Sequence, residues 1–268
     1  MTRRRFIADT WTSTSATLTG DQAAHLARVL RAQPGQIIDI VAGGFLHRAE
    51  ITRIASPTPN SSEEVHLLLH EELESDTALP LHLLIAIFKF DHLEWAIEKA
   101  TELGVARITP ILARRTEKHL AQAALARVAR WRRIALEASK QSRRTSIPSI
   151  ADPTPLTLAL AAEQSPTRIL LSELDQSTPL LTVLTKAKPD VSARVPHSSQ
   201  PHGDGWEVES PSPETTHALA IGPEGGWTPE EMQLFLDHIW QPVTLGPRIL
   251  RAETAAIAAI AIASAHLT

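Results

Sequence analysis

The sequence predicts an α/β protein in which a small β-rich domain precedes a larger domain built on a mainly parallel sheet. Three observations predict this fold class. From Leu79 onward, short apolar runs alternate with helix-like segments. Two glycine turns late in the chain each separate a short apolar strand from a helix. Before residue 75, alternating patterns joined by Gly43-Gly44 indicate a β-hairpin instead.

The first domain, expected over residues 1–75, begins with a short helix that Asp21 caps and that runs through Arg31. Residues 36–42 then alternate as a strand. Gly43-Gly44 forms a two-residue turn that accepts a positive φ at both positions, and residues 45–54 return as the partner strand.

The second domain, expected over residues 76–268, alternates strands with helices. Residues 81–88 read as a buried strand, Asp91 caps a helix that ends at Gly104, and residues 107–112 form another strand. A long basic helix over residues 121–141 can bury one face and present another to RNA or solvent. Further strand and helix patterns occupy residues 154–162, 168–172, 179–187, 218–221, 229–240 and 243–245.

The first glycine turn is Ile221-Gly222-Pro223-Glu224-Gly225-Gly226-Trp227, and a well-defined helix start follows it. Thr228 fits the N-cap, Pro229 the first helical position and Glu231 the third, which together form a capping box. The spacing is not G-x-G-x-x-G, and no Lys-Ser or Lys-Thr follows as in a P-loop. The turn therefore indicates either a ligand loop of another kind or a tight strand-to-helix connection without a ligand.

The second glycine turn is Leu245-Gly246-Pro247-Arg248-Ile249-Leu250-Arg251, which leads into an alanine-rich helix that ends near His266. It repeats the strand, turn and helix order of the first turn. We expect both turns at the carboxyl ends of neighbouring strands. Open α/β sheets bind ligands in a crevice at such ends, so this pairing favours a binding site.

An insertion-like segment over residues 186–216 is rich in Pro, Ser, Gly and charged residues and has few large apolar side chains. Such a stretch buries too little surface to offset its ordering entropy, so we expect a flexible surface loop. Trp206 is the one anchor that could dock it.

Composition excludes several classes of protein. The chain has 268 residues, 43% of them hydrophobic, and no cysteine, which rules out disulfides and thiolate metal sites. No apolar run is long enough to span a bilayer, and residues 1–20 lack the apolar segment of a secretory signal, so we expect a cytoplasmic protein with no membrane partner. His66 and His70 lack further ligands, and we read them as surface or edge-strand residues without a metal.

The net charge of -4 hides an alternation of sign along the chain. Residues 1–53 sum to +3, 54–88 to -6, 89–144 to +7 and 145–268 to -8. Two basic blocks separated by acidic ones suit a protein that grips phosphates over a limited face. The alternative is that the two basic blocks are solvent-exposed helix faces with no role in binding.

The two turns, as IGPEGGWTPEE and LGPRILRAETA, resemble the signature of the RsmE family of ribosomal RNA methyltransferases. The resemblance extends to the blocks at residues 98–105 and 137–144, to Ile147-Pro148 and to the opening Arg3-Arg4-Arg5-Phe6, and covers nearly the whole chain except the long insertion. It implies a trefoil-knotted SPOUT catalytic domain, a PUA-like RNA-binding domain, S-adenosylmethionine as methyl donor and a homodimer. The implied substrate is N3 of a uridine in 16S ribosomal RNA of the small subunit.

The resemblance also assigns roles to residues. The expected cofactor contacts are Gly222, Pro223, Glu224, Gly225, Gly226, Leu245, Gly246, Arg248, Ile249 and Leu250. Because uracil N3 is protonated at neutral pH, we expect Arg251 to stabilise the developing anion and Glu253 or Glu224 to accept the proton, although either acid could instead cap a helix or pair with an arginine. The expected RNA contacts are Arg3, Arg4, Arg5, Arg28, Arg31, Lys99, Arg114, Lys140, Arg143 and Arg144.

Two alternatives stay open on the sequence. A related knotted enzyme could methylate ribose or another base, which analysis of the modified nucleoside would distinguish. A ribosome-assembly RNA-binding protein with an inactive cofactor site is the other, and the intact glycines and Arg251 argue against it.

Overall fold

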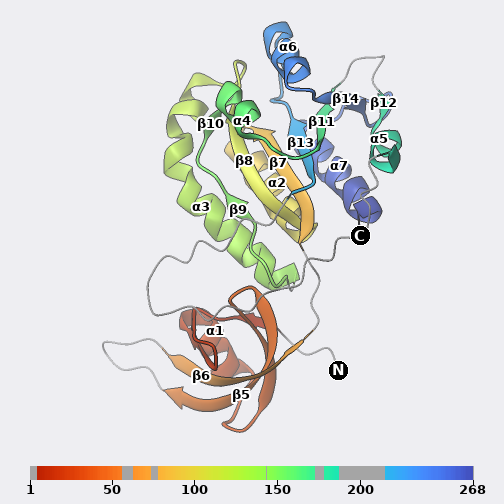
Figure 1. The fold of residues 1–268 in the computed structure, drawn as a ribbon. Helices are drawn as coiled ribbons and strands as arrows, with labels where there is room; N and C mark the ends of the chain where they lie inside the picture. The colour runs from red at the N-terminus through yellow and green to blue at the C-terminus, as the bar shows by residue number, and fades with distance from the viewer. Residues whose placement is uncertain are drawn as a thin grey trace. The chain divides into compact units, whose positions relative to one another are not determined.

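The computed structural model describes residues 5–55, 63–73, 78–142, 144–172, 178–186 and 215–267. The chain divides into two compact units (Figure 1). The first comprises residues 1–77 together with 139–146, and the second holds most of the remaining chain. The segment 187–214, which includes most of the insertion and Trp206, lies outside the described residues.

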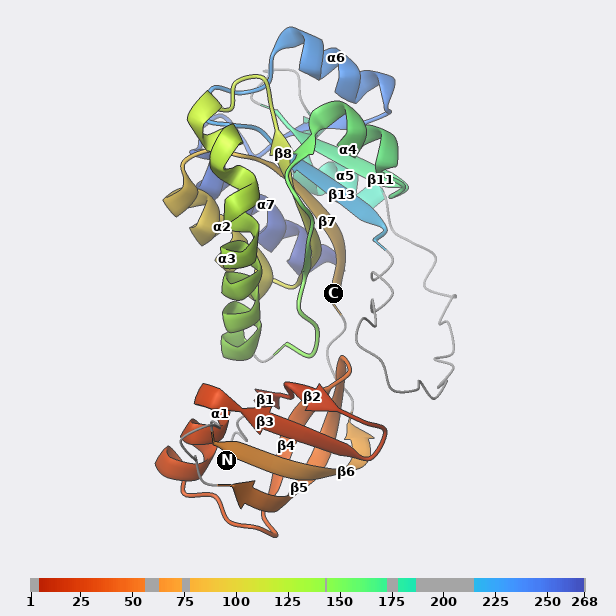
Figure 2. The ribbon, with the colours of Figure 1, turned by 90° about the vertical axis from the view of Figure 1, so that its left-hand side faces the viewer.

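The first unit is a six-stranded sheet in the order β1-β4-β5-β6-β3-β2. All its pairs are antiparallel except β1 with β4, and Figure 2 shows the sheet curled around its core. The apolar residues of alternate positions, among them Leu18, Ile40 and Ile51, fill this core. The strands are β1 Arg5–Ile7, β2 Thr10–Trp11, β3 Ser15–Thr19, β4 Ile37–Ala42, β5 Phe45–Ala55 and β6 Glu64–Leu73.

The expected hairpin is confirmed, with Gly43 at φ 61° and Gly44 at φ 87° between β4 and β5. The preceding helix differs from expectation. It begins at Gly20 as α1 (Gly20–Ala24) with Thr19 at the N-cap, so Asp21 lies in the first turn and is not the cap. It continues as a π-helix, η1 (His25–Val29), and ends before Arg31, whose φ is 52°.

The second unit is built on a parallel sheet in the order β10-β8-β7-β13-β11-β14-β12, with β9 also pairing with β8. Every described pair in it is parallel, which confirms the expected sheet. The strands are β7 Leu79–Ala86, β8 Val105–Leu112, β9 Ser149–Ile150, β10 Thr154–Pro155, β11 Thr167–Leu171, β12 Thr178–Pro179, β13 His217–Ile221 and β14 Gln241–Thr244.

Helices cover both faces of this sheet (Figures 1 and 2). One face packs against α2 (Phe90–Glu102), α3 (Lys118–Ser142), α5 (Leu180–Lys186) and α7 (Ala252–Leu267). The other face packs against α4 (Leu156–Ala162) and α6 (Pro229–Asp237). In β7, Leu83 and Ile85 enter the first layer and Leu84 the second, which explains why this strand reads as an unbroken apolar run. Asp91 lies in the first turn of α2, whose N-cap is Lys89, so the expectation that Asp91 caps this helix is wrong.

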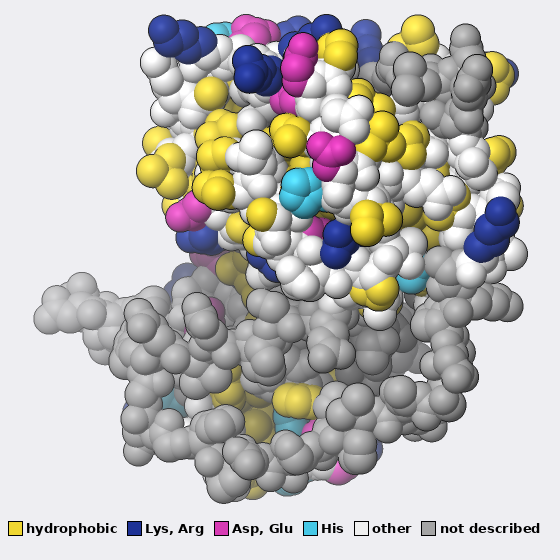
Figure 3. Space-filling model, turned by 45° about the horizontal axis from the view of Figure 1, so that its top comes forward, with side chains coloured by type: hydrophobic (Ala, Val, Ile, Leu, Met, Phe, Trp, Pro, Cys, Tyr) yellow, Lys and Arg dark blue, Asp and Glu magenta, His cyan; other side chains and the backbone are white. Residues whose placement is uncertain are grey.

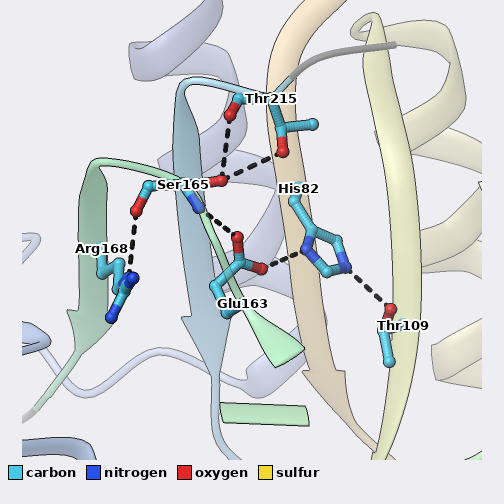
Figure 4. Close-up of polar contacts among 6 residues, drawn as sticks. All are labelled: His82, Thr109, Glu163, Ser165, Arg168 and Thr215. Atoms are coloured by element: carbon cyan, nitrogen blue, oxygen red, sulfur yellow. Dashed lines mark hydrogen bonds and ion pairs between the residues drawn. The ribbon is translucent and has the colours of Figure 1, made fainter. Parts of the chain in front are cut away.

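A buried polar network crosses the α4 side of the sheet (Figure 4). His82 of β7 donates from Nδ1 to the Glu163 carboxylate, which follows α4, and its Nε2 accepts from the Thr109 hydroxyl of β8 at 2.7 Å. The amide of Ser165 donates to the other Glu163 oxygen at 2.8 Å. Arg168 of β11 donates to the Ser165 carbonyl at 3.0 Å. The network therefore joins β7, β8, β11 and the connection after α4.

Among the described residues, no helix combines the length and the apolar character needed to cross a membrane. Within the same residues, no three or more His, Cys, Asp or Glu side chains are grouped so that they could hold a metal ion.

Candidate active site at the carboxyl edge of the parallel sheet

The first glycine turn leaves β13 at its carboxyl end and enters α6. The capping box is confirmed: Thr228 Oγ1 accepts from the Glu231 amide at 3.3 Å, and Glu231 Oε2 accepts from the Thr228 amide at 2.9 Å. Pro229 occupies the first helical position. These local bonds fix where the helix starts and, with it, the end of the turn.

A second loop, residues 113–116 after β8, holds the glycine turn from outside. The amide of Arg114 donates to Glu231 Oε1 at 2.7 Å, so this carboxylate serves the helix cap and the neighbouring loop together. Arg115 donates from Nη1 to the carbonyl of Gly225. Sequence reasoning missed both contacts. Their position in the sequence could have indicated them, because Arg114-Arg115 lies just after the carboxyl end of a predicted strand, where loops of an α/β sheet form ligand sites.

The space beside the first turn is filled by side chains. A Cβ at Gly222 would lie 3.1 Å from Nε1 of Trp227, and a Cβ at Gly225 would lie 3.3 Å from Cδ of Arg115. Trp227 in turn packs edge-on against Phe235 of α6, with ring centroids 4.8 Å apart. Because glycine has no side chain, Gly222 and Gly225 allow Trp227 and Arg115 to pack closely against the turn, in addition to any role in binding.

The second glycine turn follows β14, and it is more open. The Thr244 hydroxyl bonds to the carbonyl and amide of Gly246, each at 3.1 Å. Gly246 has φ 115°, a conformation that favours glycine, and a Cβ there would meet nothing within 4 Å. Ile249 is 80% exposed. Free space above an exposed backbone is what a bound small molecule requires.

The two turns lie at the same edge of the sheet, but their strands are not neighbours. β11 pairs with both β13 and β14 and lies between them, so the expectation of adjacent strands is wrong. One intervening strand widens the separation of the two turns by about 5 Å. A ligand that contacts both turns would accordingly have to span more than the distance between adjacent strands.

The three residues expected to act in catalysis differ in environment. Glu224 and Arg251 are exposed, and no hydrogen bond or ion pair to the Arg251 side chain occurs within the described residues. Glu253, in the first turn of α7, is only 4% exposed and faces His92 of α2. The arginine is thus free to meet a ligand, whereas Glu253 is not directly accessible.

Comparison with known proteins identifies the family. Residues 75–264 match the RNA methyltransferase domain family, and residues 18–58 match the RNA methyltransferase PUA domain. The chain is 34% identical to ribosomal RNA small subunit methyltransferase E of Synechocystis sp., over 94% of this chain and 74% of the relative. It is 30% identical to the Bacillus subtilis protein of that name, over 92% of this chain and 88% of the relative. The chain belongs to the ribosomal RNA small subunit methyltransferase E (RsmE) family.

Solved structures agree with this assignment. An RsmE from Neisseria gonorrhoeae bound to S-adenosyl methionine is 28% identical, has a TM-score of 0.66, and aligns over 97% of this chain and 96% of its own. A putative methyltransferase from Legionella pneumophila, in complex with the cofactor SAM, is 26% identical with a TM-score of 0.70, over 99% and 98%. The expected α/β fold with an N-terminal PUA-type domain is confirmed, and the SPOUT class and the trefoil knot stay predictions.

The expected RNA contacts of this RsmE-family chain in the first unit are only partly described. Arg3 and Arg4 lie outside the described residues, and Arg5 begins β1 without a described side chain. Arg28 pairs with Glu63 at 2.7 Å, while Arg31 is exposed. Arg31 therefore offers a freer charge to a phosphate than Arg28 does.

The remaining expected RNA contacts lie between residues 99 and 144, and those at 140, 143 and 144 also belong to the first unit. Lys99 pairs with Glu98 and Glu102 at 2.7 and 2.8 Å, and Arg114 is exposed. Burial lowers the pKa of Arg144 to about 10. Lys140 lies in the last turn of α3, and Arg143 lies outside the described residues. Figure 3 shows basic side chains along the upper edge of the face it presents, above an area rich in apolar side chains.

Proposed function

We propose that this protein transfers a methyl group from S-adenosylmethionine to N3 of a specific uridine in 16S ribosomal RNA. The observation that carries the proposal is the pair of glycine turns at the carboxyl edge of the sheet, one held rigid and one open, in a chain of the RsmE family. The names of the relatives support the ribosomal RNA substrate and the cofactor.

The residues fit the cofactor at the second turn, where Gly246 leaves open space over an exposed backbone. Leu245, Gly246, Arg248, Ile249 and Leu250 would hold it from this side, and residues 222–226 from the other. The cofactor supplies an activated methyl group on a sulfonium, so the protein needs mainly to align the nucleophile with it.

Arg251 suits stabilisation of the negative charge that develops on the uracil ring, because it is exposed at the start of α7 and carries a permanent charge. Proton removal from N3 requires an acceptor; of the two acids that the sequence offers, Glu224 is exposed and Glu253 is buried. The target base has to be single-stranded or swung out of its stack, because N3 is engaged in pairing inside a duplex.

RNA recognition falls to the first unit, in keeping with its match to the RNA methyltransferase PUA domain, and to basic residues of the second. We further propose that the domains divide between residues 75 and 76, that two copies form a homodimer, and that the enzyme works in the cytoplasm. Small ribosomal subunits are the proposed partner.

The test is transfer of labelled methyl from S-adenosylmethionine to small ribosomal subunits from a strain that lacks this gene, followed by nucleoside analysis. A single new N3-methyluridine supports the proposal. Label on ribose or on another base would support methyltransferase activity but refute uridine N3 as its target. Absence of label despite cofactor binding would indicate a different RNA or a role in assembly.

A further inference from the structure

His92 and Glu253 face each other at the proposed site, and neither side chain has a hydrogen bond within the described residues. His92 is the third residue of α2, and Glu253 is the second residue of α7. The two helices pack against each other, and His92 Nδ1 lies 3.6 Å from Glu253 Oε1. Both helices begin where the chain leaves the carboxyl edge of the sheet. Glu253 lies two residues after Arg251.

The two side chains are buried to different degrees. Glu253 is 4% exposed, and its Oε2 is a buried atom without a hydrogen-bond partner. His92 Nδ1 is likewise buried and unpartnered, yet the whole side chain is 32% exposed. The exposed edge of the ring is thus the one that carries Nε2. From inside to outside, the order is carboxylate, imidazole, solvent.

The charged neighbours of the ring come from both helices. Glu253 of α7 lies behind Nδ1, and Asp91 of α2, with a side chain 78% exposed, places Oδ2 at 3.8 Å from Nε2. Lys89 and Arg251 precede the two helices in the chain. A carboxylate thus lies on each side of the imidazole, a placement that suits a ring that takes up a proton during reaction.

A buried carboxylate is costly unless it is paired, and the α7 N-terminus offsets only part of that cost. In catalytic histidines a buried carboxylate accepts the Nδ1 proton and so leaves Nε2 free to accept another; at 3.6 Å from Nδ1, Glu253 is placed for this role once the two side chains close to hydrogen-bond distance. Glu253 is too deeply buried to touch a base itself, and Glu224 has no such support in the described structure.

We propose that His92 is the catalytic base for the methyl transfer, with Glu253 as its positioning residue. The inference rests on the proposed uridine N3 methylation. The N3–H bond breaks and its proton moves to His92 Nε2. The electron pair left on N3 forms the N3–CH3 bond, and the pair of the broken S–CH3 bond stays on sulfur. Arg251 balances the charge that develops on the uracil ring in between.

The first test reads the protonation of the His92 ring directly. Nitrogen-15 spectra of the full-length protein report which ring nitrogen of His92 carries the proton, assigned with His92→Gln. We expect the Nδ1–H form, with Nε2 unprotonated, near neutral pH, and a shift of this equilibrium in Glu253→Gln. An Nε2–H ring in the wild-type protein would overturn the inference, because that nitrogen could not accept a proton.

The second test measures single-turnover methyl transfer to small subunits as a function of pH, together with cofactor affinity by calorimetry. We expect the rate of His92→Gln to fall about 100-fold or more. We also expect its rate no longer to decline in acid, while its cofactor affinity stays unchanged. His119→Gln is the matched control, since His119 lies 3.4 Å from Glu117 on the exposed surface. This control is expected to match the wild type in rate, pH profile and affinity.

The outcomes separate the two proposals. If the wild-type protein makes no N3-methyluridine, the proposed function fails, and with it the substrate named here. If it does make N3-methyluridine and His92→Gln keeps the rate and pH profile, only the inference is overturned. Loss of cofactor binding in His92→Gln would also overturn it, because His92 would then be a cofactor contact.

Discussion

The buried pair His82 and Glu163 predicts how the stability of this protein depends on pH. Burial alone would raise the pKa of Glu163, but the hydrogen bonds from His82 and from the amide and hydroxyl of Ser165 outweigh it and hold the pKa to about 2, against 4.5 for a free side chain. Burial lowers the pKa of His82 from 6.5 despite the bond to Glu163. The pair therefore consists of a neutral imidazole and a carboxylate near neutral pH.

Both pKa values are lower in the folded state, so both groups stabilise the fold at higher pH. The contribution of His82 is complete above pH 6.5 and declines below it, and that of Glu163 is complete above about pH 4.5 and is lost as the pH falls toward 2. For Glu163 the difference between 4.5 and about 2 corresponds to about 3 kcal/mol of unfolding free energy. Its side chain is 3% exposed, so solvent screens this interaction little.

The perturbation is Glu163→Gln. The new amide can accept from only one of the donors that surround the carboxylate, and its NH2 group would face the other donor, which leaves a buried hydrogen bond unmade. We expect about 2–3 kcal/mol less unfolding free energy at pH 7, measured by urea titration with tryptophan fluorescence. Below pH 4.5 the gap between wild type and variant closes, because acid removes the same charge from the wild-type protein.

The matched control is Glu117→Gln, which alters an exposed carboxylate 3.4 Å from a histidine, and we expect it to leave stability unchanged within about 0.5 kcal/mol. Two results would refute the reasoning. One is a Glu163→Gln protein as stable as the wild type at pH 7. The other is a stability gap that stays constant down to pH 3, since the loss would then come from packing and not from the charge.

Three further predictions concern the proposed active site. Gly222→Val abolishes cofactor binding measured by calorimetry, and because its Cβ pushes on the Trp227 indole 3.1 Å away, it also lowers the melting temperature by a few degrees; normal affinity would contradict this. Arg115→Ala removes the bond to the Gly225 carbonyl and weakens cofactor binding about tenfold, whereas an unchanged Kd would show that the turn holds its shape alone. Arg251→Ala keeps cofactor affinity but loses about 100-fold or more in turnover, and joint loss of both would make Arg251 a cofactor contact only.

Local features of the sequence predicted local structure well. The capping box of α6 and the Gly43-Gly44 hairpin depend on residues within four positions of each other, and both formed as expected. The caps expected at Asp21 and Asp91 did not form, and each helix begins two residues earlier, with Thr19 or Lys89 at the N-cap. An acidic residue in the first turn stabilises a helix through its dipole as well as through capping, so its presence does not fix the first residue.

Contacts between distant segments could not be predicted in this way. The position of β11 between β13 and β14 depends on which strands pair, and strands of a parallel sheet pair across long connections that carry no register signal. The bond from the Arg114 amide to Glu231 spans 117 positions, and the facing of His92 and Glu253 depends on two helices packed together. Glu231 was recognised as a cap because that role is local. Its role in holding a second loop required the fold.

The structure also shows how rigidity is divided between the two turns. The first turn is held by the α6 capping box, by the Arg114 amide and by Arg115, so its backbone is fixed before any ligand arrives. In the part of the chain that the structure describes, the second turn has the Thr244 bonds to Gly246 and a bond from the Ala255 amide to the Arg251 carbonyl, and its remaining residues are largely exposed. A ligand that fits between them pays ordering entropy mainly on one side, and its affinity benefits from the preformed other side. The ordering of the second turn would then also position Arg251 and the start of α7, which places the charge for the reaction only when the cofactor is bound.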